Sequence, residues 1–258
     1  MVEKMKVTLL GTGTSQGVPV IACNCEVCSS QNPKDKRLRS SVMIEVDGQI
    51  LVVDTGPDFR QQMLRYSVER VDAILFTHHH KDHVAGMDDI RAFNYKLKKD
   101  MQIFCSDITA AALKNEFPYV FSEIKYPGTP NVNLNIIKNK RFQILNTNII
   151  PIKAKHYMMS IFGFRIRDFV YLTDVSAISD IEKDKMKDAD LIILDALRKK
   201  EHLSHFNLDQ AIALLEEVQP KRALLTHISH YMGLNDIINK DLPAHIQLAY
   251  DGQQIILS

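Results

Sequence analysis

Four side chains that could bind metal lie within six positions of one another, directly after a stretch typical of a buried strand: His78, His80, Asp82 and His83. Imidazole and carboxylate are the usual ligands of zinc, iron or manganese at a hydrolytic centre. His78 and His80 alternate along an extended segment, so they point the same way and can hold one ion together. Asp82 and His83 can face a second ion, whereas His79 should point away. One catalytic ion needs about three protein ligands, so other parts of the chain must complete two sites.

Further ligand-type residues occur where other strands are predicted to end. They are His156 after residues 149–154, Asp174 after 171–173 and His227 after 224–226. A carboxylate such as Asp174 can bridge two cations, offset their repulsion and place a bridging hydroxide between them. Taken singly, Asp174 could equally be a turn cap and His156 a surface residue. Their shared position after strands favours a site with two metal ions.

Cysteines form a second group of candidate ligands. Three of the four cysteines lie within six positions, at Cys23, Cys25 and Cys28. A disulfide across so short a loop would be strained and three thiols cannot all pair, so a structural zinc is favoured. We expect His230 as the fourth ligand, because one loop carrying His227 and His230 could serve both sites. Cys105 and His245 are the alternatives, and Cys105 lies in an apolar pattern typical of the core.

Composition limits the classes of protein that fit this chain. Its 258 residues are 45% hydrophobic and 24% charged, a balance typical of a soluble globular protein. A net charge of +1 gives no global basic field that could hold a long nucleic acid. The N-terminus lacks the hydrophobic region of a signal peptide, and no apolar run approaches the roughly 18 residues that cross a bilayer. We therefore expect a cytoplasmic protein with no membrane partner.

The elements that must position the candidate ligands begin with antiparallel strands. Residues 41–46 and 49–53 flank Asp47-Gly48, a turn pair that tolerates positive φ, and so predict a β-hairpin. Strand-like residues 7–10 run into a glycine-rich loop over 11–17. This loop lacks the G-x-G-x-x-G spacing and the following helix of a dinucleotide site, so we interpret it as a flexible strand exit.

The rest of the chain alternates short strands with helices. Asp107 can cap a helix that follows it. Residues 246–250 and 253–257 bracket Asp251-Gly252 and predict a closing hairpin. No internal repeat or linker divides the chain, so we expect one domain over residues 1–258. Hairpins combined with strand–helix units predict a sandwich of two mixed sheets with helices outside.

These residues together resemble the metallo-β-lactamase superfamily of dinuclear metal hydrolases. The matching positions extend along the chain: Asp54, Thr77-His78-x-His80-x-Asp82-His83, His156, Asp174 and His227. The resemblance implies the four-layered αββα fold, an α/β (α+β) sandwich of two mixed sheets. It also implies a division of the ligands, with one ion bound by His78, His80 and His156, the other by Asp82, His83 and His227, and Asp174 bridging the two.

A narrower resemblance comes from motifs outside the metal loop. These are Gly11-Thr12-Gly13-Thr14-Ser15-x-Gly17-Val18-Pro19, the three cysteines, Asp88-Asp89-Ile90-Arg91 and Thr226-His227-Ile228-Ser229-His230. Together they resemble the branch of the superfamily formed by phosphoribosyl cyclic phosphodiesterases of the carbon–phosphorus lyase pathway. This resemblance implies hydrolysis of a small or cyclic phosphodiester.

A candidate proton donor comes from residues 204–211, which are similar to the region that supplies a histidine beside the metals in tRNA 3′-end ribonucleases. Ser204 stands where glycine is usual, which leaves His205 as the match and His202 as the competing register. An unligated imidazole at His205 could donate its proton to the leaving oxygen, with Asp82 helping to orient it. The alternative is an ordinary surface histidine ahead of a helix.

The sequence therefore predicts a phosphodiesterase with two catalytic cations, bridged by a hydroxide, and one structural zinc. Zinc, manganese and iron all suit the His/Asp donors. Processing of tRNA 3′ ends is the alternative enzyme activity, weakened by the lack of a basic, Gly/Pro-rich arm. A non-catalytic zinc-binding regulatory module is the alternative of another class. The expected partner is a small phosphodiester, with nucleic acid a weaker candidate, and a homodimer is compatible with the sequence.

Overall fold

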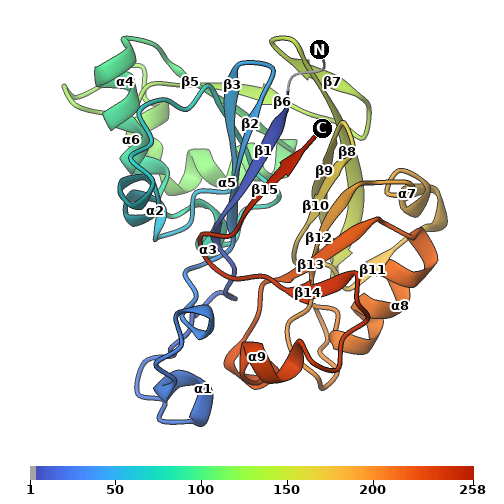
Figure 1. The fold of residues 1–258 in the computed structure, drawn as a ribbon. Helices are drawn as coiled ribbons and strands as arrows, with labels where there is room; N and C mark the ends of the chain where they lie inside the picture. The colour runs from blue at the N-terminus through green and yellow to red at the C-terminus, as the bar shows by residue number, and fades with distance from the viewer. Residues whose placement is uncertain (1–3) are drawn as a thin grey trace.

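Two β-sheets pack face to face in the computed structural model, which describes residues 4–258 (Figure 1). The first sheet runs, from edge to edge, through β15 (Gln254–Leu257), β1 (Met5–Gly11), β2 (Ser41–Val46), β3 (Gln49–Val53), β4 (Ala73–Leu75), β5 (Met101–Cys105) and β6 (Val132–Ile136). The second runs through β11 (Ala177–Ile178), β8 (Thr147–His156), β9 (Met159–Ile166), β10 (Phe169–Leu172), β12 (Leu191–Asp195), β13 (Arg222–Thr226) and β14 (Ile246–Leu248), with β7 (Phe142–Ile144) paired to β8.

Helices lie outside the sheets. The first half of the chain forms α1 (Glu26–Ser29), α2 (Phe59–Arg65), α3 (Lys81–Val84), α4 (Arg91–Leu97), α5 (Asp107–Glu116), α6 (Pro118–Phe121) and the 3₁₀ turns η1 (Pro33–Asp35) and η2 (Met87–Ile90). The second half forms α7 (Asp180–Asp184), α8 (Leu208–Val218), α9 (Asn235–Ile238) and η3 (His230–Met232). In Figure 1, α2, α4, α5 and α6 cover the first sheet, while α7 and α8 cover the second. The predicted four-layered αββα sandwich of two mixed sheets is confirmed.

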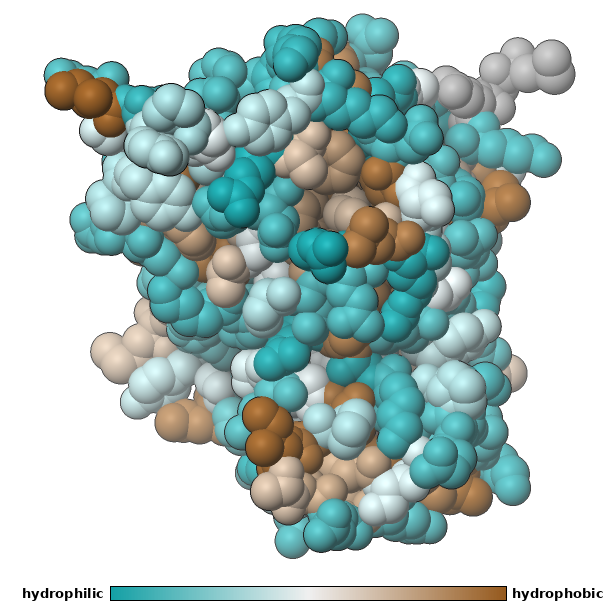
Figure 2. Space-filling view, turned by 90° about the vertical axis from the view of Figure 1, so that its left-hand side faces the viewer, coloured by the Kyte–Doolittle hydropathy of each residue, from teal (hydrophilic) through white to brown (hydrophobic). Residues whose placement is uncertain are grey.

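Apolar side chains between the sheets hold the two layers together. Leu9 and Ile44 from the first sheet belong to one cluster with Phe164 and Tyr171 from the second. Full burial of a side chain of this kind contributes about 1.5–3 kcal/mol. Separate clusters lie beneath the helices on each outer face. Seen from the side of α2, α4 and α6, the surface is mostly hydrophilic, with apolar side chains in small patches (Figure 2).

Parallel pairing brings strand ends to a common edge in each sheet. In the first sheet β3, β4, β5 and β6 are parallel neighbours. In the second sheet β10, β12, β13 and β14 are parallel neighbours. The residues that follow parallel strands therefore gather at one edge of their sheet, which is where ligands bind in open α/β sheets.

Local turn chemistry agrees with the sequence at one position and differs at another. The hairpin between β2 and β3 is confirmed, and its turn residues Asp47 and Gly48 have φ of 50° and 70°. The prediction that Asp107 caps α5 is wrong, because Ser106 Oγ accepts the N–H of Thr109 at 3.1 Å. Asp107 instead lies in the first turn of the helix, where its negative charge is favourable.

The predicted closing hairpin is also wrong. β14 pairs in parallel with β13, whereas β15 pairs antiparallel with β1, so the chain crosses from the second sheet to the first between them. The physical reason lies at Asp251, whose carboxylate accepts the N–H groups of Thr12 at 2.9 Å and Leu38 at 2.7 Å. The turn is thus anchored to two distant segments instead of closing on itself.

Within residues 4–258, the helices are all too short or too polar to cross a membrane.

Candidate metal centre

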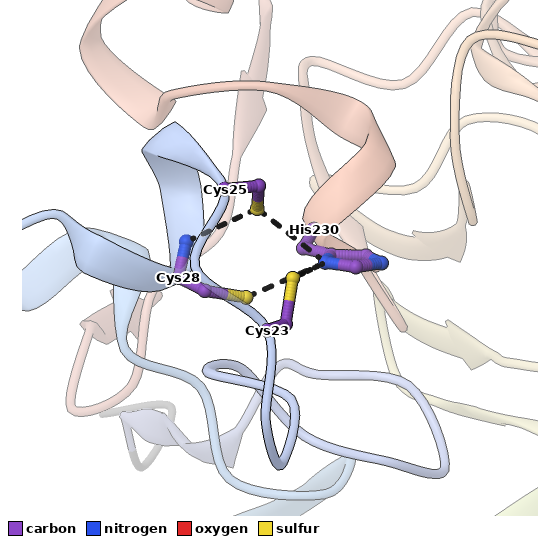
Figure 3. Close-up of side chains that lie close together, drawn as sticks. All are labelled: Cys23, Cys25, Cys28 and His230. Carbon is purple, nitrogen blue, oxygen red and sulfur yellow. Dashed lines mark hydrogen bonds between the residues drawn. The ribbon is translucent and has the colours of Figure 1, made fainter.

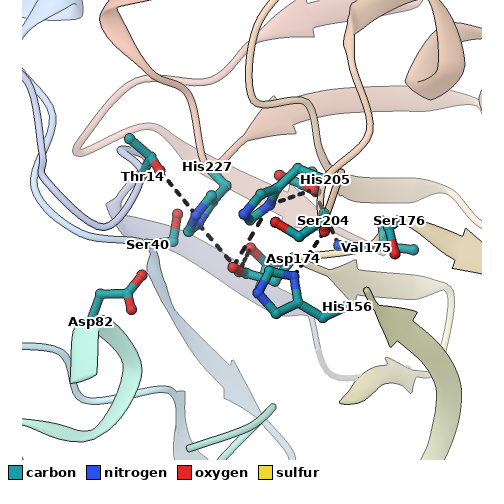
Figure 4. Close-up of polar contacts among 12 residues, drawn as sticks. Thr14, Ser40, Asp82, His156, Asp174, Val175, Ser176, Ser204, His205 and His227 are labelled. Atoms are coloured by element: carbon teal, nitrogen blue, oxygen red, sulfur yellow. Dashed lines mark hydrogen bonds and ion pairs between the residues drawn. The ribbon is translucent and has the colours of Figure 1, made fainter. Parts of the chain in front are cut away.

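The ligand residues predicted from the sequence follow the ends of strands in both sheets. His78 comes soon after β4. His227 directly follows β13, and Asp174 follows the end of β10 after one intervening residue. His156 ends β8. Because the two sheets face each other, residues from distant parts of the chain meet in one place, as Figure 4 shows for His156, Asp174, His205 and His227.

The structure brings all seven predicted His/Asp residues together in two groups. In one group the ligand atoms lie within 4.8 Å of one another and belong to His78, His80 and His156. In the other, by the same measure, they belong to Asp82, His83, Asp174 and His227. We call these seven residues the His/Asp centre. Asp174, implied as a bridge, falls in the second group, while the other six residues lie in the groups that the family resemblance implied and His79 lies outside both.

Buried nitrogen atoms without partners show that the centre suits cations. His78 Nε2, His83 Nε2 and His227 Nδ1 are fully buried and none makes a hydrogen bond, although His83 Nε2 lies 3.1 Å from Asp82 Oδ2 and 3.2 Å from Asp174 Oδ2. Buried polar atoms in proteins nearly always make a hydrogen bond, so these three nitrogens are available to another ligand. A divalent ion is the partner that suits imidazole nitrogens beside carboxylates.

One ring nitrogen in each of three ligand histidines is held by a neighbour outside the ligand set. His83 Nδ1 lies 2.8 Å from Asp54 Oδ2, and His156 Nδ1 lies 2.8 Å from the Ser204 carbonyl oxygen. His227 Nε2 lies 3.2 Å from the Thr14 hydroxyl. Bonds of this kind fix the tautomer and the orientation of a metal-binding imidazole. The free nitrogens are therefore held in place for an ion.

Negative charge is concentrated around the second group. Burial alone would lower the pKa of His83, but Asp174, Asp82 and Asp54 raise it well above its ordinary value. Burial would likewise raise the pKa of the Asp174 carboxyl, but His227 and His83 lower it well below its usual range. The Asp174 and Asp82 carboxylates, whose pKa values are both lowered, thus stay ionised and attract a positive charge, which a divalent ion would supply.

Three residues of the region adopt a left-handed backbone where strands end. Asp54 has φ of 63°, and Asp174 and His227 each have φ of 57°. This conformation costs a non-glycine residue on the order of 1–3 kcal/mol and persists only where the surroundings impose it. At Asp54 the contacts of the side chain impose this conformation, because its carboxylate accepts hydrogen bonds from both the N–H and the hydroxyl of Thr77. Strain of this kind clusters at functional sites.

The candidate proton donor His205 lies beside the His/Asp centre. Its ring centroid is 4.7 Å from that of His156, and its Nδ1 is 3.8 Å from Asp174 Oδ1. His202 is exposed, with its ring 5.3 Å from that of His205, and belongs to none of the ligand groups. The geometry therefore favours the register that matches His205.

The expectation that Asp82 orients His205 is wrong. Asp195 Oδ2 lies 3.2 Å from His205 Nδ1 and also accepts the N–H of Val175 at 3.1 Å. Burial alone would lower the pKa of His205, but Asp195 raises it to about 9. Sequence reasoning missed Asp195. Its signal was a carboxylate at the end of a buried strand, the same signal that marks Asp54 and Asp174.

The three clustered cysteines meet His230 (Figure 3). His230 Nδ1 lies 3.2 Å from Cys23 Sγ, 3.5 Å from Cys25 Sγ and 3.4 Å from Cys28 Sγ. We call these four residues the cysteine cluster, and their ligand atoms lie within 4.8 Å of one another. Three thiols and one imidazole are the donor set of a structural zinc.

The alternatives for the fourth position lie elsewhere. Cys105 is fully buried in β5, as its apolar pattern predicted. His245 lies 3.5 Å from Glu216. Within the cluster, the N–H of Cys28 lowers the pKa of the Cys25 thiol to about 6. A thiolate is the form that binds zinc.

Comparison with known sequences gives one family and several relatives. The beta-lactamase superfamily domain matches residues 49–228. An octanoyltransferase from Porphyromonas gingivalis is 36% identical over 256 residues, which is 98% of this chain and 52% of that protein. A ribonuclease Z from Methanococcus maripaludis is 27% identical over 128 residues, 48% of this chain and 35% of that protein. The chain thus spans about half the length, or less, of these curated relatives.

Comparison with solved structures finds the same architecture. A diphosphatase from the PhnP family has a TM-score of 0.93 and 37% identity, covering 100% of this chain and 98% of its own. Zinc-bound PqqB from Methylobacterium extorquens has a TM-score of 0.80 at 17% identity, over 97% and 99% of the two chains. The short form of human tRNase Z has a TM-score of 0.70 at 20% identity, over 97% and 98%. The last two likenesses concern the fold alone.

Proposed function

The chain belongs to the metallo-β-lactamase superfamily and is a metal-dependent hydrolase, and from this premise we propose that it cleaves a small or cyclic phosphodiester. One observation carries the proposal: two groups of candidate ligands adjoin at Asp174, with an ionisable histidine, His205, beside them. The likeness to a PhnP-family diphosphatase over nearly the whole of both chains supports a phosphate substrate. The octanoyltransferase is about twice as long as this chain, so the activity in its name cannot be placed in the half of that protein that this chain matches.

In this proposal the His/Asp centre holds two divalent ions. His78, His80 and His156 would hold one ion, Asp82, His83 and His227 would hold the other, and Asp174 adjoins both groups. Bound ions of this type polarise a phosphate and lower the pKa of a water molecule to near neutrality. Zinc, manganese and iron all suit the donors, and the cysteine cluster would hold a separate structural zinc.

The chain's own residues prepare the site and move a proton. Asp54 holds His83 by its Nδ1, which directs Nε2 toward Asp82 and Asp174 at 3.1 and 3.2 Å. Asp195 holds His205 by its Nδ1, which leaves Nε2 as the nitrogen that faces the departing oxygen. Asp195 raises the pKa of His205 to about 9, so the charges of the chain itself favour the protonated imidazole, which can donate that proton to an alkoxide.

A panel of substrates tests this proposal. We expect the metal-loaded protein to hydrolyse 2′,3′-cyclic nucleotides, ribose 1,2-cyclic phosphate or bis(p-nitrophenyl) phosphate, and to lose this activity with a chelator. In His205→Ala, turnover of the cyclic ribose substrates should fall by about 10²–10⁴-fold. Turnover of bis(p-nitrophenyl) phosphate should fall less, because p-nitrophenolate leaves without a proton.

Other outcomes would favour the alternatives. Cleavage of precursor tRNA alone, with tight and salt-sensitive binding, would favour tRNA 3′ processing. Hydrolysis of lactones or thioesters alone would contradict a phosphodiester substrate. Inactivity on every substrate with both ions bound would favour a zinc-binding regulatory module.

A further inference from the structure

Residues 11–14 of the glycine-rich loop are buried and tightly packed, which differs from the flexible strand exit that the sequence predicted. A Cβ atom on Gly11 would lie 2.0 Å from the Arg39 carbonyl oxygen. The N–H of Gly13 donates to the Leu38 carbonyl at 2.7 Å. Gly13 also forms bridges with Arg39 on one side and Ile228 on the other. The glycines therefore allow close approach of three backbone segments, one of which carries His227.

The loop holds the backbone of Ile228, the residue that directly follows His227, by two hydrogen bonds. The N–H of Ile228 donates to the Thr12 carbonyl at 2.9 Å, and the N–H of Thr14 donates to the Ile228 carbonyl at 3.2 Å. His227 itself has the left-handed φ of 57°. Because Ile228 is its direct neighbour, these two bonds help to impose that conformation.

The loop also contacts the imidazole ring. Thr14 is 8% exposed, and its hydroxyl lies 3.2 Å from His227 Nε2 (Figure 4). His227 Nδ1 lies 3.3 Å from Asp174 Oδ2 and has no hydrogen-bond partner. A bond from Nε2–H to the Thr14 oxygen leaves the lone pair on Nδ1, the nitrogen that faces Asp174.

A buried hydrogen-bond network holds the loop at Thr12, two residues before Thr14. The Thr12 hydroxyl donates to Asp251 Oδ1 at 2.8 Å and accepts from Arg37 at 2.8 Å. Arg37 and Thr12 are both buried, and the Asp251 side chain is 4% exposed. The crossing between the two sheets at Asp251 thus fixes the loop two residues before Thr14.

We propose that Thr14 is a positioning residue for His227, holding its Nε2 so that Nδ1 is presented to the ion between Asp82, His83 and Asp174. This inference rests on the proposed two-ion hydrolase. It assigns a role to the glycine-rich motif, which acts as a support for one metal ligand. Loss of a hydrogen bond behind a ligand imidazole typically weakens metal binding by about 10–100-fold.

The test compares three variants by titration with Mn²⁺ alone, following free Mn²⁺ by electron paramagnetic resonance. Mn²⁺ is a hard ion and avoids the thiols of the cysteine cluster. Thr14→Val removes the hydroxyl and keeps the shape, while Thr14→Ser keeps the hydroxyl. Thr8→Val is the matched control, because Thr8 is fully buried and its hydroxyl has no partner.

We expect the unaltered protein, Thr14→Ser and Thr8→Val to bind two Mn²⁺ ions with similar affinities. Thr14→Val should bind one of them about 10–100-fold more weakly, with a metal-free Tm close to that of Thr8→Val. Unchanged binding in Thr14→Val would overturn the inference, as would equal weakening in Thr14→Ser, which would show that packing and not the hydroxyl matters. Fewer than two Mn²⁺ ions on the unaltered protein would overturn the two-ion proposal itself, and this inference with it.

Discussion

The His/Asp centre and the cysteine cluster take their ligands from the chain in opposite ways. Ligands of the His/Asp centre extend from His78 to His227 and follow strands of both sheets. The cysteine cluster takes three of its four from residues 23–28, around the short helix α1. The first site is thus assembled by the fold, whereas the second is mostly one local loop with His230 added.

The surroundings of the ligands differ as well. Residues outside the ligand set hold the rings of the His/Asp centre, as Asp54 does for His83 and Ser204 for His156. In the cysteine cluster the thiols mainly face one another and His230, with backbone N–H groups of Cys28 and Val20 as further partners. We infer that the first site is preorganised for ions, while the second depends on its ion to hold it together.

Replacing Asp174 should break the His/Asp centre most severely. Asp174→Asn removes the carboxylate that contacts His83 and His227 and adjoins the His156 group. We expect turnover of phosphodiesters to fall on the order of a thousandfold or more, since metal ions supply several kcal/mol of transition-state stabilisation. Steady-state kinetics with metal analysis checks this. Asp168→Asn is the control, because Asp168 is exposed, forms an ion pair with Arg165 and belongs to neither group of ligands. Full turnover in Asp174→Asn would contradict the assignment.

Replacing a cysteine should separate structure from catalysis. We expect Cys25→Ser to lose one zinc per chain. A decrease of about 2–3 kcal/mol in the free energy of unfolding would then lower the Tm by about 5–10 °C. At a temperature where the variant is folded, its turnover should stay within about tenfold of that of the unaltered protein, because hydrogen bonds outside the cysteine cluster hold the ligands of the His/Asp centre. Zinc analysis and thermal unfolding measure both effects. Cys105→Ala, outside the cluster, should keep its zinc, and an unchanged zinc content in Cys25→Ser would count against a structural site.

The smallest expected effect concerns the pH dependence set by Asp195. The pKa of His205 is raised to about 9, so the protonated donor is present at neutral pH and is lost as pH rises through that value. Asp195→Asn removes the main cause of this shift, so the alkaline decline of turnover should move toward the ordinary histidine range near pH 6.5. The pH–rate profile with a cyclic ribose substrate measures this decline. The same profile with bis(p-nitrophenyl) phosphate should show little change, and an unmoved decline with both substrates would show that His205 is not the donor.

The groups of ligands that lie close together in the chain could be predicted from residue types and spacing. His78 to His83 form one loop after one strand, and Cys23 to Cys28 form another, so spacing alone indicated both groups of ligands. Strand patterns followed by single ligand residues then led to the sandwich and to His156, Asp174 and His227. A side chain that emerges from a strand end needs no long-range information to be recognised as a candidate.

The residues that support those ligands became evident from the packing of the two sheets. Thr14 and His227 are 213 positions apart, and Thr12 and Asp251 are 239 apart. The turn at Asp251 has the local chemistry of a hairpin, yet pairing with β1 and β13 carries its two flanks into different sheets. Hydrogen bonds of this range depend on how the two sheets pack, and no pattern of neighbouring residues encodes them.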